Sequence, residues 1–313
     1  SVIENHPCPE ECDPSLPDII PWKGDKFTEI DKDGNIVWDW NTFDYIELNE
    51  YNPFWIEEYS GQIDFDWTHS NAVYFDEQLN SVFVSIRNLS RITAIDYSTK
   101  NILWNLGEEE FMNETSFQDH FGFSHQHSSQ ITHDNNLIFF DNGRFNEPEL
   151  SRCLEVDFNN GESAELVWEY VLPDSMSTLS RGECDRLLNN NTLITAGRTG
   201  NVIELNENNE IVWHMNVESN QGADVSIYRS QRVLNLYPNI FSFEIDNMSG
   251  QYNEYVFEHN SEELDVTIYN QGWADQNYQY EFLNQNDNIL LFDEVVIAAN
   301  QHFDLTLDIS SFV

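Results

Sequence analysis

Four segments of the chain share one pattern: a short apolar strand, a polar turn, and a second strand that carries Ile, Val or Leu before a tryptophan. The copies lie at residues 29–38, 94–104, 155–168 and 204–213. Asn, Asp and Gly favour tight turns and β-branched residues favour strands, so each copy is typical of a β-hairpin. Fourfold repetition restricts the chain to folds built from copies of one unit.

Two further short strands precede three of these hairpins, within residues 72–86, 129–140 and 185–195. Four strands per repeat are typical of a β-propeller blade, whereas β-helix coils are shorter and a sandwich does not repeat in fours. The sequence therefore predicts an all-β chain with a β-propeller of four-stranded blades. Besides three complete units we expect a half unit near 26–40 and a strand-rich piece at 224–237, which leave the ring incomplete unless upstream residues or shared terminal blades close it.

The chain changes character after residue 238. Residues 240–313 contain no Lys or Arg and lack the tryptophan hairpin, and apolar residues alternate at 263–269 and 303–309. Such alternation predicts a small Ig-like β-sandwich. We expect three parts: a Pro- and Cys-containing N-terminal segment at 1–25, the propeller at 26–238, and the sandwich at 239–313 with an attachment or spacer role.

The charge excludes several classes of partner. With 56 acidic and 13 basic residues the net charge is -43, which repels nucleic acid and anionic membrane surfaces. No apolar stretch is long enough for membrane insertion, whereas 14% aromatic residues supply a large core. We expect no cofactor. Calcium stays open as an ion for acidic turns such as residues 31–35, which also fit an ordinary hairpin turn.

The cysteines indicate an oxidising compartment. Cys8 and Cys12 lie in a Pro-rich segment with no His or Cys placed to complete a zinc site, so we expect a local disulfide. Cys153 and Cys184 fall in successive repeats and would join them, with two buried free thiols as the alternative. The chain begins with Ser rather than Met. We therefore expect a processed protein that is secreted, extracellular or at the cell surface.

Histidines open two of the repeats, His69 within residues 66–71 and His127 within 124–130. Inner blade strands start near the central channel, so both are expected to face it, where imidazole can act as nucleophile or as general acid and base. His125 and His127 would also suit zinc or copper. No Cys or acidic residue completes that ligand set, so no metal site is predicted.

Arginines occur where the blades begin or turn inward. They are Arg87, Arg144, Arg152, Arg181 and Arg229. In an acidic chain they predict a local site for sulfate, phosphate or carboxylate, because guanidinium offers paired donors to such anions. The alternative is that each arginine neutralises neighbouring acids.

At these residues the chain resembles the arylsulfotransferase family, secreted enzymes that use no nucleotide sulfate donor. The matching elements follow in the family's order at residues 66–71, 86–90, 102–107, 126–130, 140–143, 151–152 and 191–194. The resemblance implies a six-bladed propeller. Its axial pocket would move a sulfuryl group from an aryl sulfate to a phenol through a sulfated histidine.

Carried over residue by residue, the resemblance makes His69 and His127 pocket histidines and Arg144 or Arg152 the anion-binding arginine. We expect His127, His69 and Arg144 to be catalytic, and Arg152, Arg181, Asn71, His125 and Arg87 to bind substrate. One departure stands out. Residues 179–186 contain no histidine where the best-characterised members carry the sulfated one, and they resemble a branch with Arg-Gly there, here Arg181-Gly182.

Two functions stay open. The retained histidines and arginines favour a sulfotransferase-like enzyme acting on small aromatic sulfates and phenols. The missing histidine and the incomplete ring favour a noncatalytic extracellular propeller that binds a ligand or surface polymer, or joins an extracellular assembly. The end of the propeller at residues 228–238 resembles that of surface proteins of marine Bacteroidetes, which supports an extracellular location.

Overall fold

The chain forms two compact units, Ser1–Gln231 and Arg232–Val313. The computed structural model describes residues 1–61, 63–111, 116–117, 119–187, 189–222, 225–233, 240–245, 248–251, 254–257, 263–283, 286 and 288–308. The expected boundary at 238/239 lies outside the described residues. Regular structure in them is almost entirely β-strand. None of the described helices has the length and apolar character needed to cross a membrane.

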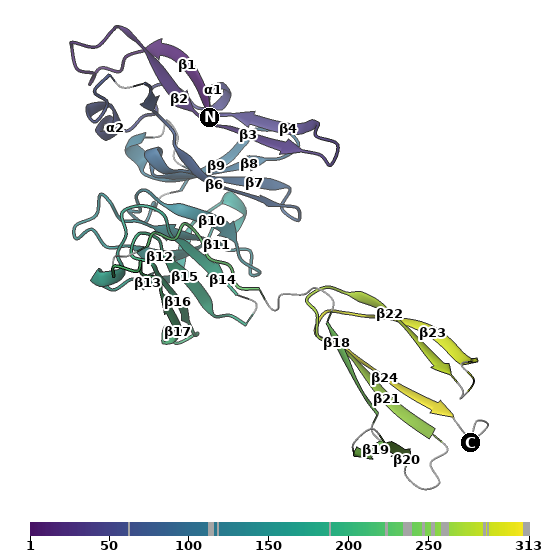
Figure 1. Cartoon of the computed structure of the whole chain (residues 1–313). Helices are drawn as coiled ribbons and strands as arrows, with labels where there is room; N and C mark the ends of the chain where they lie inside the picture. Colours follow the sequence, from purple (N-terminus) through teal and green to yellow (C-terminus); the bar gives the residue numbers. More distant parts are fainter. Residues whose placement is uncertain are drawn as a thin grey trace. The chain divides into compact units, whose positions relative to one another are not determined.

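Three four-stranded antiparallel sheets dominate the first unit (Figure 1). The first blade contains β6 (Ser70–Asp76), β7 (Ser81–Ile86), β8 (Arg91–Asp96) and β9 (Ile102–Gly107). The second contains β10 (His127–Ile131), β11 (Leu137–Asp141), β12 (Arg152–Asp157) and β13 (Glu165–Val171). The third contains β14 (Glu183–Arg186), β15 (Thr192–Ala196), β16 (Asn201–Leu205) and β17 (Ile211–Asn216). Strand order follows the chain in each sheet, which confirms the predicted β-propeller of four-stranded blades.

Smaller elements precede the first blade. Strands β1 (Val2–Pro7), β2 (Ile19–Gly24) and β5 (Phe65–Asp66) form a three-stranded sheet, and β3 (Lys26–Ile30) pairs with β4 (Ile36–Asn41). The two helices are single turns, α1 (Thr42–Tyr45) and α2 (Pro53–Glu57). The hairpin β3–β4 is the half unit expected near 26–40. The segment at 1–25 contributes two paired strands that its composition did not reveal.

The inner strands of the second blade are buried on both faces. In β11 all five residues are buried; Phe139 packs into a core shared with the first blade, whereas Ile138 and Phe140 pack into a core shared with the third. Consecutive residues of a strand point to opposite faces, so an uninterrupted apolar run binds two neighbours. Strand β10 accordingly contacts both β6 and β14.

Two disulfides confirm the expected pairing. Cys8 and Cys12 close a local loop, and Cys153 of β12 joins Cys184 of β14 within the core between the second and third blades. The second bond fixes the spacing of these two blades directly.

The prediction of a strand-rich piece at 224–237 is wrong for the residues that the structure describes there, because residues 225–233 contain no strand. This segment bonds to the third blade irregularly instead, with Ile227 N–H donating to the Gly197 carbonyl at 2.7 Å. The prediction failed because a segment with alternating apolar residues can lie along a sheet without pairing as a further strand, and the pattern is the same in both cases.

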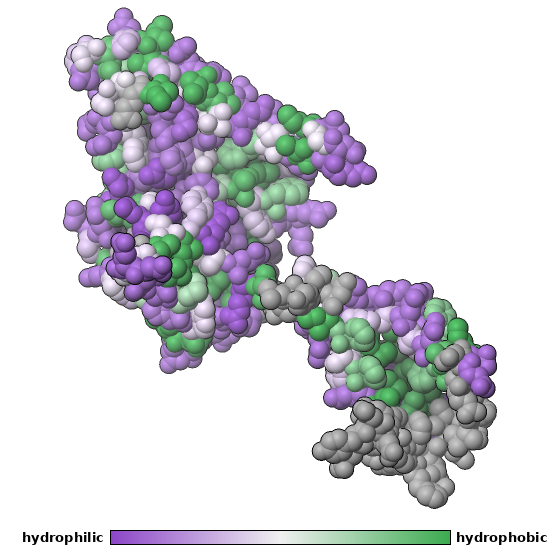
Figure 2. Space-filling model, viewed as in Figure 1, coloured by the Kyte–Doolittle hydropathy of each residue, from purple (hydrophilic) through white to green (hydrophobic). Residues whose placement is uncertain are grey.

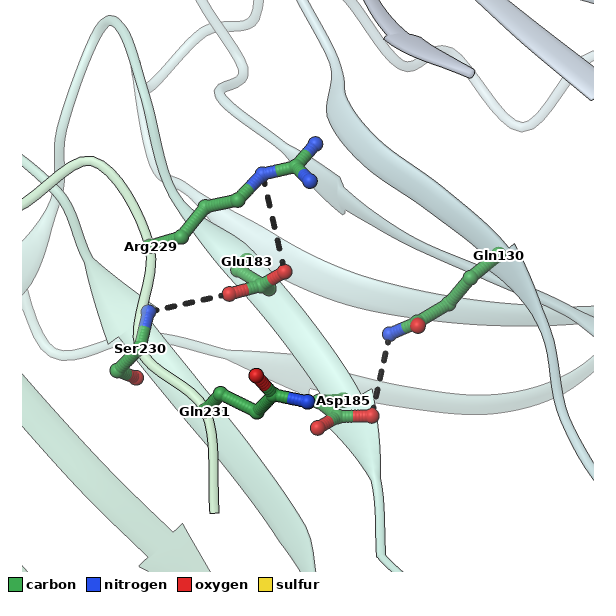
Figure 3. A pocket seen from close by; sticks show the side chains of 6 residues that line it. All are labelled: Gln130, Glu183, Asp185, Arg229, Ser230 and Gln231. Carbon is green, nitrogen blue, oxygen red and sulfur yellow. Dashed lines mark hydrogen bonds and ion pairs between the residues drawn. The ribbon is translucent and has the colours of Figure 1, made fainter. Parts of the chain in front are cut away.

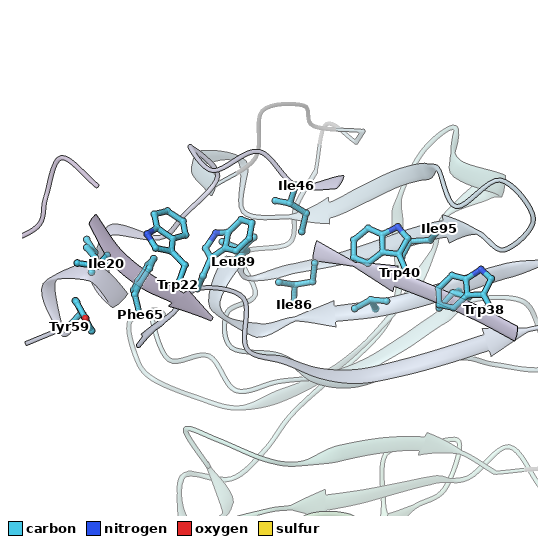
Figure 4. Packing of buried hydrophobic residues seen from close by; sticks show 14 residues of the cluster. Ile20, Trp22, Trp38, Trp40, Ile46, Tyr59, Phe65, Ile86, Leu89 and Ile95 are labelled. Carbon is cyan, nitrogen blue, oxygen red and sulfur yellow. The ribbon is translucent and has the colours of Figure 1, made fainter. Parts of the chain in front are cut away.

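The core at the N-terminal side of the first blade is rich in tryptophan (Figure 4). The Trp22 ring lies edge-on to Phe65 at 4.9 Å and to Trp67 at 5.4 Å. Beside this core Arg91, fully buried at the start of β8, contacts Glu50 at 2.6 Å. This ion pair connects the first blade to the loop that leads into α2.

The second unit is a small β-sandwich. One sheet has the order β18 (Phe241–Ile245), β21 (Glu263–Asn270), β24 (His302–Asp308); the others pair β22 (Gln276–Leu283) with β23 (Ile289–Ile297) and β19 (Met248–Gln251) with β20 (Glu254–Phe257). Leu264, Val266 and Ile268 are buried, and Tyr280 packs against them from β22. Figure 2 shows apolar residues gathered in the hollow of this unit, where a cavity of about 450 Å³ lies.

Glu50→Ala should lower the free energy of unfolding of the first unit by about 3–5 kcal/mol, because it leaves the Arg91 guanidinium buried without its partner. Urea denaturation followed by tryptophan fluorescence measures the change. The control is Glu57→Ala, which removes an exposed carboxylate from α2. Equal stability of the two variants would contradict this role for the ion pair.

Candidate functional site

One edge of the blades collects most of the predicted site residues. The register there pairs Ser70 with Ile86, His127 with Phe140, and Glu183 with Thr195. The second strands of the three blades, β7, β11 and β15, end at this edge. Counted from the last residue of each, His69, His125 and Arg181 occupy equivalent positions in the three blades. All three have left-handed backbone, with φ of 46°, 58° and 66°. Non-glycine residues adopt this conformation at a cost and often do so at functional sites.

This register corrects the sequence alignment, which matched His69 with His127. The shared pair His-Ser suggested that match, but the strand pairing puts His125 in the place of His69. His127 is the first residue of β10 itself.

His69 is held in one orientation. Its Nδ1 donates a short hydrogen bond to Asp66, and the Lys23 ammonium group lies 3.1 Å from the other carboxylate oxygen. Burial raises the pKa of Asp66, but the contacts with His69 and Lys23 outweigh burial and lower it overall. Asp25 accepts hydrogen bonds from the residues on either side of His69, at 2.7 and 2.6 Å. The His69 side chain is 42% exposed, so Nε2 is accessible to a ligand.

His127 is a buried neutral imidazole with a defined tautomer. Nδ1 donates to Asn142 Oδ1 at 2.6 Å, and Nε2 accepts the backbone N–H of Arg181 at 3.2 Å. Asn142 is itself oriented, because its amide nitrogen donates to the carbonyls of Thr178 and Arg181. Burial lowers the pKa of His127 to about 4, although the Nδ1 hydrogen bonds to Asn142 and to the His125 carbonyl act in the opposite direction. Near neutral pH the ring is therefore neutral, and its Nε2 lone pair is used by the Arg181 N–H.

His125 is a buried ring between two aromatic rings. Its centroid lies 5.1 Å from that of Trp55 and 4.7 Å from that of Phe145. Among the described residues neither ring nitrogen has a hydrogen-bond partner. Burial, together with the charges of Arg87 and Arg144, lowers the pKa of His125 to about 2. His125 thus acts here as a neutral packing ring.

Two arginines lie against aromatic faces. The Arg87 guanidinium carbon is 4.9 Å from the centroid of Trp55, and that of Arg144 is 5.4 Å from the centroid of Phe54. Such cation–π contacts hold a guanidinium in place without cancelling its charge. Burial lowers the pKa of Arg87 to about 10, so Arg87 is still a cation at neutral pH. We call His69, His125, His127, Arg87 and Arg144 the His/Arg cluster.

Ion pairing separates these two arginines from four others. Carboxylates pair with Arg91, Arg152, Arg186 and Arg229. In the part of the chain that the structure describes, Arg87, Arg144 and Arg181 make no ion pair. A guanidinium left without a carboxylate is unexpected in a chain with a net charge of -43. The edge therefore presents positive charge to an anion from solution.

An aromatic wall, formed by Phe54, Trp55 and Phe145, adjoins the cluster. Phe54 and Trp55 come from α2, whose first turn is fixed by Pro53 and by a 3.0 Å hydrogen bond from Phe54 N–H to the Asn52 side chain. The Phe54 ring lies 5.2 Å from the Phe145 ring. Phe145 is 41% exposed, so apolar ring surface borders the charged groups on the solvent side.

Two predicted residues lie beside the cluster without joining it. The Arg152 guanidinium donates to Asp141 and Glu169 at 2.8 and 2.7 Å and to a backbone carbonyl, so all its nitrogens are engaged within the chain. The Asn71 amide donates to the Gln126 carbonyl at 2.8 Å and connects the first and second blades. The structure thus brings together His69, His127, His125, Arg87 and Arg144, with Arg181 adjacent through its backbone.

Sequence reasoning missed Asp66, Asn142 and the aromatic wall. Asp66 stands three residues before His69 inside the motif already singled out, so its spacing was a usable signal. The contacts of Trp55 with Arg87 and His125 span long stretches of sequence and leave no local pattern.

A second cavity, of about 380 Å³, lies along the inner strands of the second and third blades (Figure 3). Gln130, Glu183, Asp185, Arg229, Ser230 and Gln231 line it. Burial raises the pKa of the Glu183 and Asp185 carboxyl groups, although hydrogen bonds from Ser128 and Gln130 oppose that change. Across the described residues no group of three or more His, Cys, Asp or Glu is arranged to hold a metal ion.

Comparison with known proteins gives one family. The model of the family described as Arylsulfotransferase (ASST) matches residues 15–229. No curated protein matches the chain.

Solved structures give distant similarities. They include a protein of unknown function from Bacteroides caccae (12% identity, 88% of this chain and 68% of that chain, TM-score 0.38). Virginiamycin B lyase from Staphylococcus aureus (12%, 89% and 77%, 0.35) and the β-propeller domain of Swd1 from Myceliophteria thermophila (10%, 70% and 67%, 0.28) are also similar. These TM-scores are too low to place any residue or activity, and the fold follows from the strand order of the chain itself.

His127→Asn should reduce the dependence of the free energy of unfolding on pH below about pH 6.5. The folded pKa of His127 is about 4 against a usual 6.5, so the unfolded chain binds the extra proton between these pH values. Wild-type stability should fall, relative to the variant, by about 1.4 kcal/mol for each pH unit from 6.5 to 4. Urea denaturation of both proteins at several pH values measures this; parallel profiles would contradict a buried neutral His127.

Proposed function

The chain belongs to the arylsulfotransferase family, and on that premise we propose that it transfers a sulfuryl group from an aryl sulfate to a phenolic acceptor at the His/Arg cluster. The observation that carries the proposal is the pair Arg87 and Arg144. Neither makes an ion pair within the described residues of this strongly acidic chain, and each is held on an aromatic ring. An aryl sulfate matches both features of the site: its anionic group suits the arginines, and its planar ring suits the aromatic wall.

The sulfate oxygens would be bound by Arg87 and Arg144. Guanidinium donates paired hydrogen bonds to tetrahedral oxyanions and stabilises the charge that develops as the S–O bond to the aryl oxygen breaks. Arg87 is partly buried, where such an interaction is less screened by water than at the surface.

Proton transfer would fall to His69. The leaving phenolate takes up a proton and the acceptor phenol loses one, which an accessible imidazole can supply and remove. His69 fits this role because Asp66 binds Nδ1 and the side chain is partly exposed, which leaves Nε2 for the transfer. His127 is buried, and its Nε2 accepts the backbone N–H of Arg181, so it would hold the Arg181 backbone in place while His69 moves the proton.

An extracellular location belongs to the same proposal. Two disulfides are typical of proteins that fold in an oxidising compartment. The C-terminal β-sandwich would act there as an Ig-like attachment or spacer module.

The noncatalytic alternative has its own support. Arg181 stands where the best-characterised relatives carry the sulfated histidine, and Arg181 makes no ion pair in the described part of the chain. A propeller that binds a sulfated ligand or polymer without turning it over would need the arginines alone. Aryl sulfate binding without release of phenol favours this function.

Arg144→Ala and His69→Ala should each lower kcat/KM for acceptor-dependent phenol release, Arg144→Ala by about a hundredfold to a thousandfold and His69→Ala by at least about a hundredfold. The readout is absorbance from a chromogenic aryl sulfate with and without an acceptor phenol. His133→Ala is the matched control, since His133 is 45% exposed, lies beside Asp134 and belongs to the opposite edge of the second blade. No turnover by folded wild-type protein across several donors and acceptors would contradict the transferase.

Asp66→Asn should lower kcat at least about a hundredfold and leave KM for the aryl sulfate nearly unchanged, because Asp66 orients His69 and touches no substrate. A loss confined to KM would instead make Asp66 a determinant of binding. Full kinetic profiles against donor concentration separate the two results.

A further inference from the structure

A loop brings one more reactive side chain to the His/Arg cluster. Residues 225–231 form what we call the closing segment, which runs along the third blade after β17 and bonds to it repeatedly. Ile227 N–H donates to the Gly197 carbonyl at 2.7 Å, and Ser230 N–H donates to Glu183 at 3.2 Å. Arg229 lies 3.8 Å from the same carboxylate, as Figure 3 shows. The residue between these anchors is Tyr228.

Tyr228 faces the cluster. Its ring centroid is 6.3 Å from that of His127, with the two rings edge to face at 73°. The Arg229 guanidinium carbon lies 5.9 Å from the Tyr228 centroid. Although burial dominates and lowers the pKa of Arg87, the phenol of Tyr228 acts on it in the opposite direction, which places the two groups near each other. Half of the Tyr228 surface is exposed, and among the described residues its hydroxyl has no hydrogen-bond partner.

The other candidate nucleophiles here are bonded, buried or assigned to proton transfer. His69 Nδ1 is bonded to Asp66, which suits a proton carrier, and His125 is fully buried. His127 Nε2 already accepts an N–H from the backbone of Arg181. In the described part of the chain no cysteine is free. Tyr228 is thus the exposed, unpaired oxygen nucleophile beside the arginines.

Resting on the proposed function, we propose that Tyr228 Oη is the covalent carrier, which holds the sulfuryl group as O-sulfotyrosine between two half-reactions. This assigns to a loop tyrosine the role that no histidine at residues 179–186 can fill.

The chemistry balances without a further reactant. In the first half-reaction the bond from Tyr228 Oη to sulfur forms and the bond from sulfur to the donor's aryl oxygen breaks. The Tyr228 proton moves to a histidine Nε2 and from there to the departing phenolate. In the second, an acceptor phenol attacks the same sulfur, its proton leaves by the same route, and Tyr228 regains a proton.

The carrier bond is well matched to the substrates. An aryl O–S ester breaks and another forms in each half-reaction, so the intermediate lies close in free energy to donor and product. Arg229, which lies beside the Tyr228 ring, and the nearby Arg87 would stabilise the negative charge of a sulfate on Tyr228.

Wild-type protein incubated with a chromogenic aryl sulfate and no acceptor should gain the mass of one SO₃ group and release one equivalent of phenol. Peptide mapping at neutral pH should place the added mass on Tyr228, and an acceptor phenol should remove it. Tyr228→Phe should lose the label and the acceptor-dependent turnover while keeping its unfolding temperature. The control Tyr97→Phe removes a hydroxyl that bonds to Glu29 on the far edge of the blade and should behave as wild type.

The outcomes separate this inference from the proposed function. Turnover by wild type with the label on a histidine, or undiminished turnover by Tyr228→Phe, would overturn the tyrosine carrier and leave the transferase intact. A folded wild type that neither releases phenol nor gains mass would sink both.

Discussion

Packing between blades is the constraint on which the remaining structure depends. Strands such as β11 are apolar on both faces, so no blade can bury its residues without a neighbour on each side. Phe139 packs toward the first blade and Phe140 toward the third, which fixes the strand register of the second relative to both. Because the register is fixed, the starts of β6, β10 and β14 lie at one edge. The His/Arg cluster is a consequence of that alignment.

Charge supplies a second constraint. In a chain with a net charge of -43 a carboxylate is the expected neighbour of any arginine, and Arg91, Arg152, Arg186 and Arg229 each have one. Arg87 and Arg144 make no ion pair among the described residues and lie on the rings of Trp55 and Phe54, which orient a guanidinium and leave its charge for an external anion. The short helix α2 thus has an electrostatic role that its apolar residues alone would not indicate.

The repeated hairpins predicted the blades because period-two patterns and turn residues are local properties of a sequence. Local pattern also suggested the disulfides and the sandwich. The match of His69 with His127 failed, since equivalence within blades depends on strand register, and His125 takes that place. Arg152 could not be told from Arg144 by sequence, because Asp141 and Glu169 reach it only after the strands pair. The wall formed by α2 and Phe145 has no local signal, because it exists only when distant segments meet.

The three equivalent positions, His69, His125 and Arg181, each lie just before the first paired strand of a separate blade. A change at one of them alters a single contribution to the site and leaves the other two in place. Exchange of a histidine for an arginine therefore needs no refolding of its neighbours. Each blade supplies its own side chain to the site. A family with this architecture can therefore lose, move or replace a reactive group in single evolutionary steps.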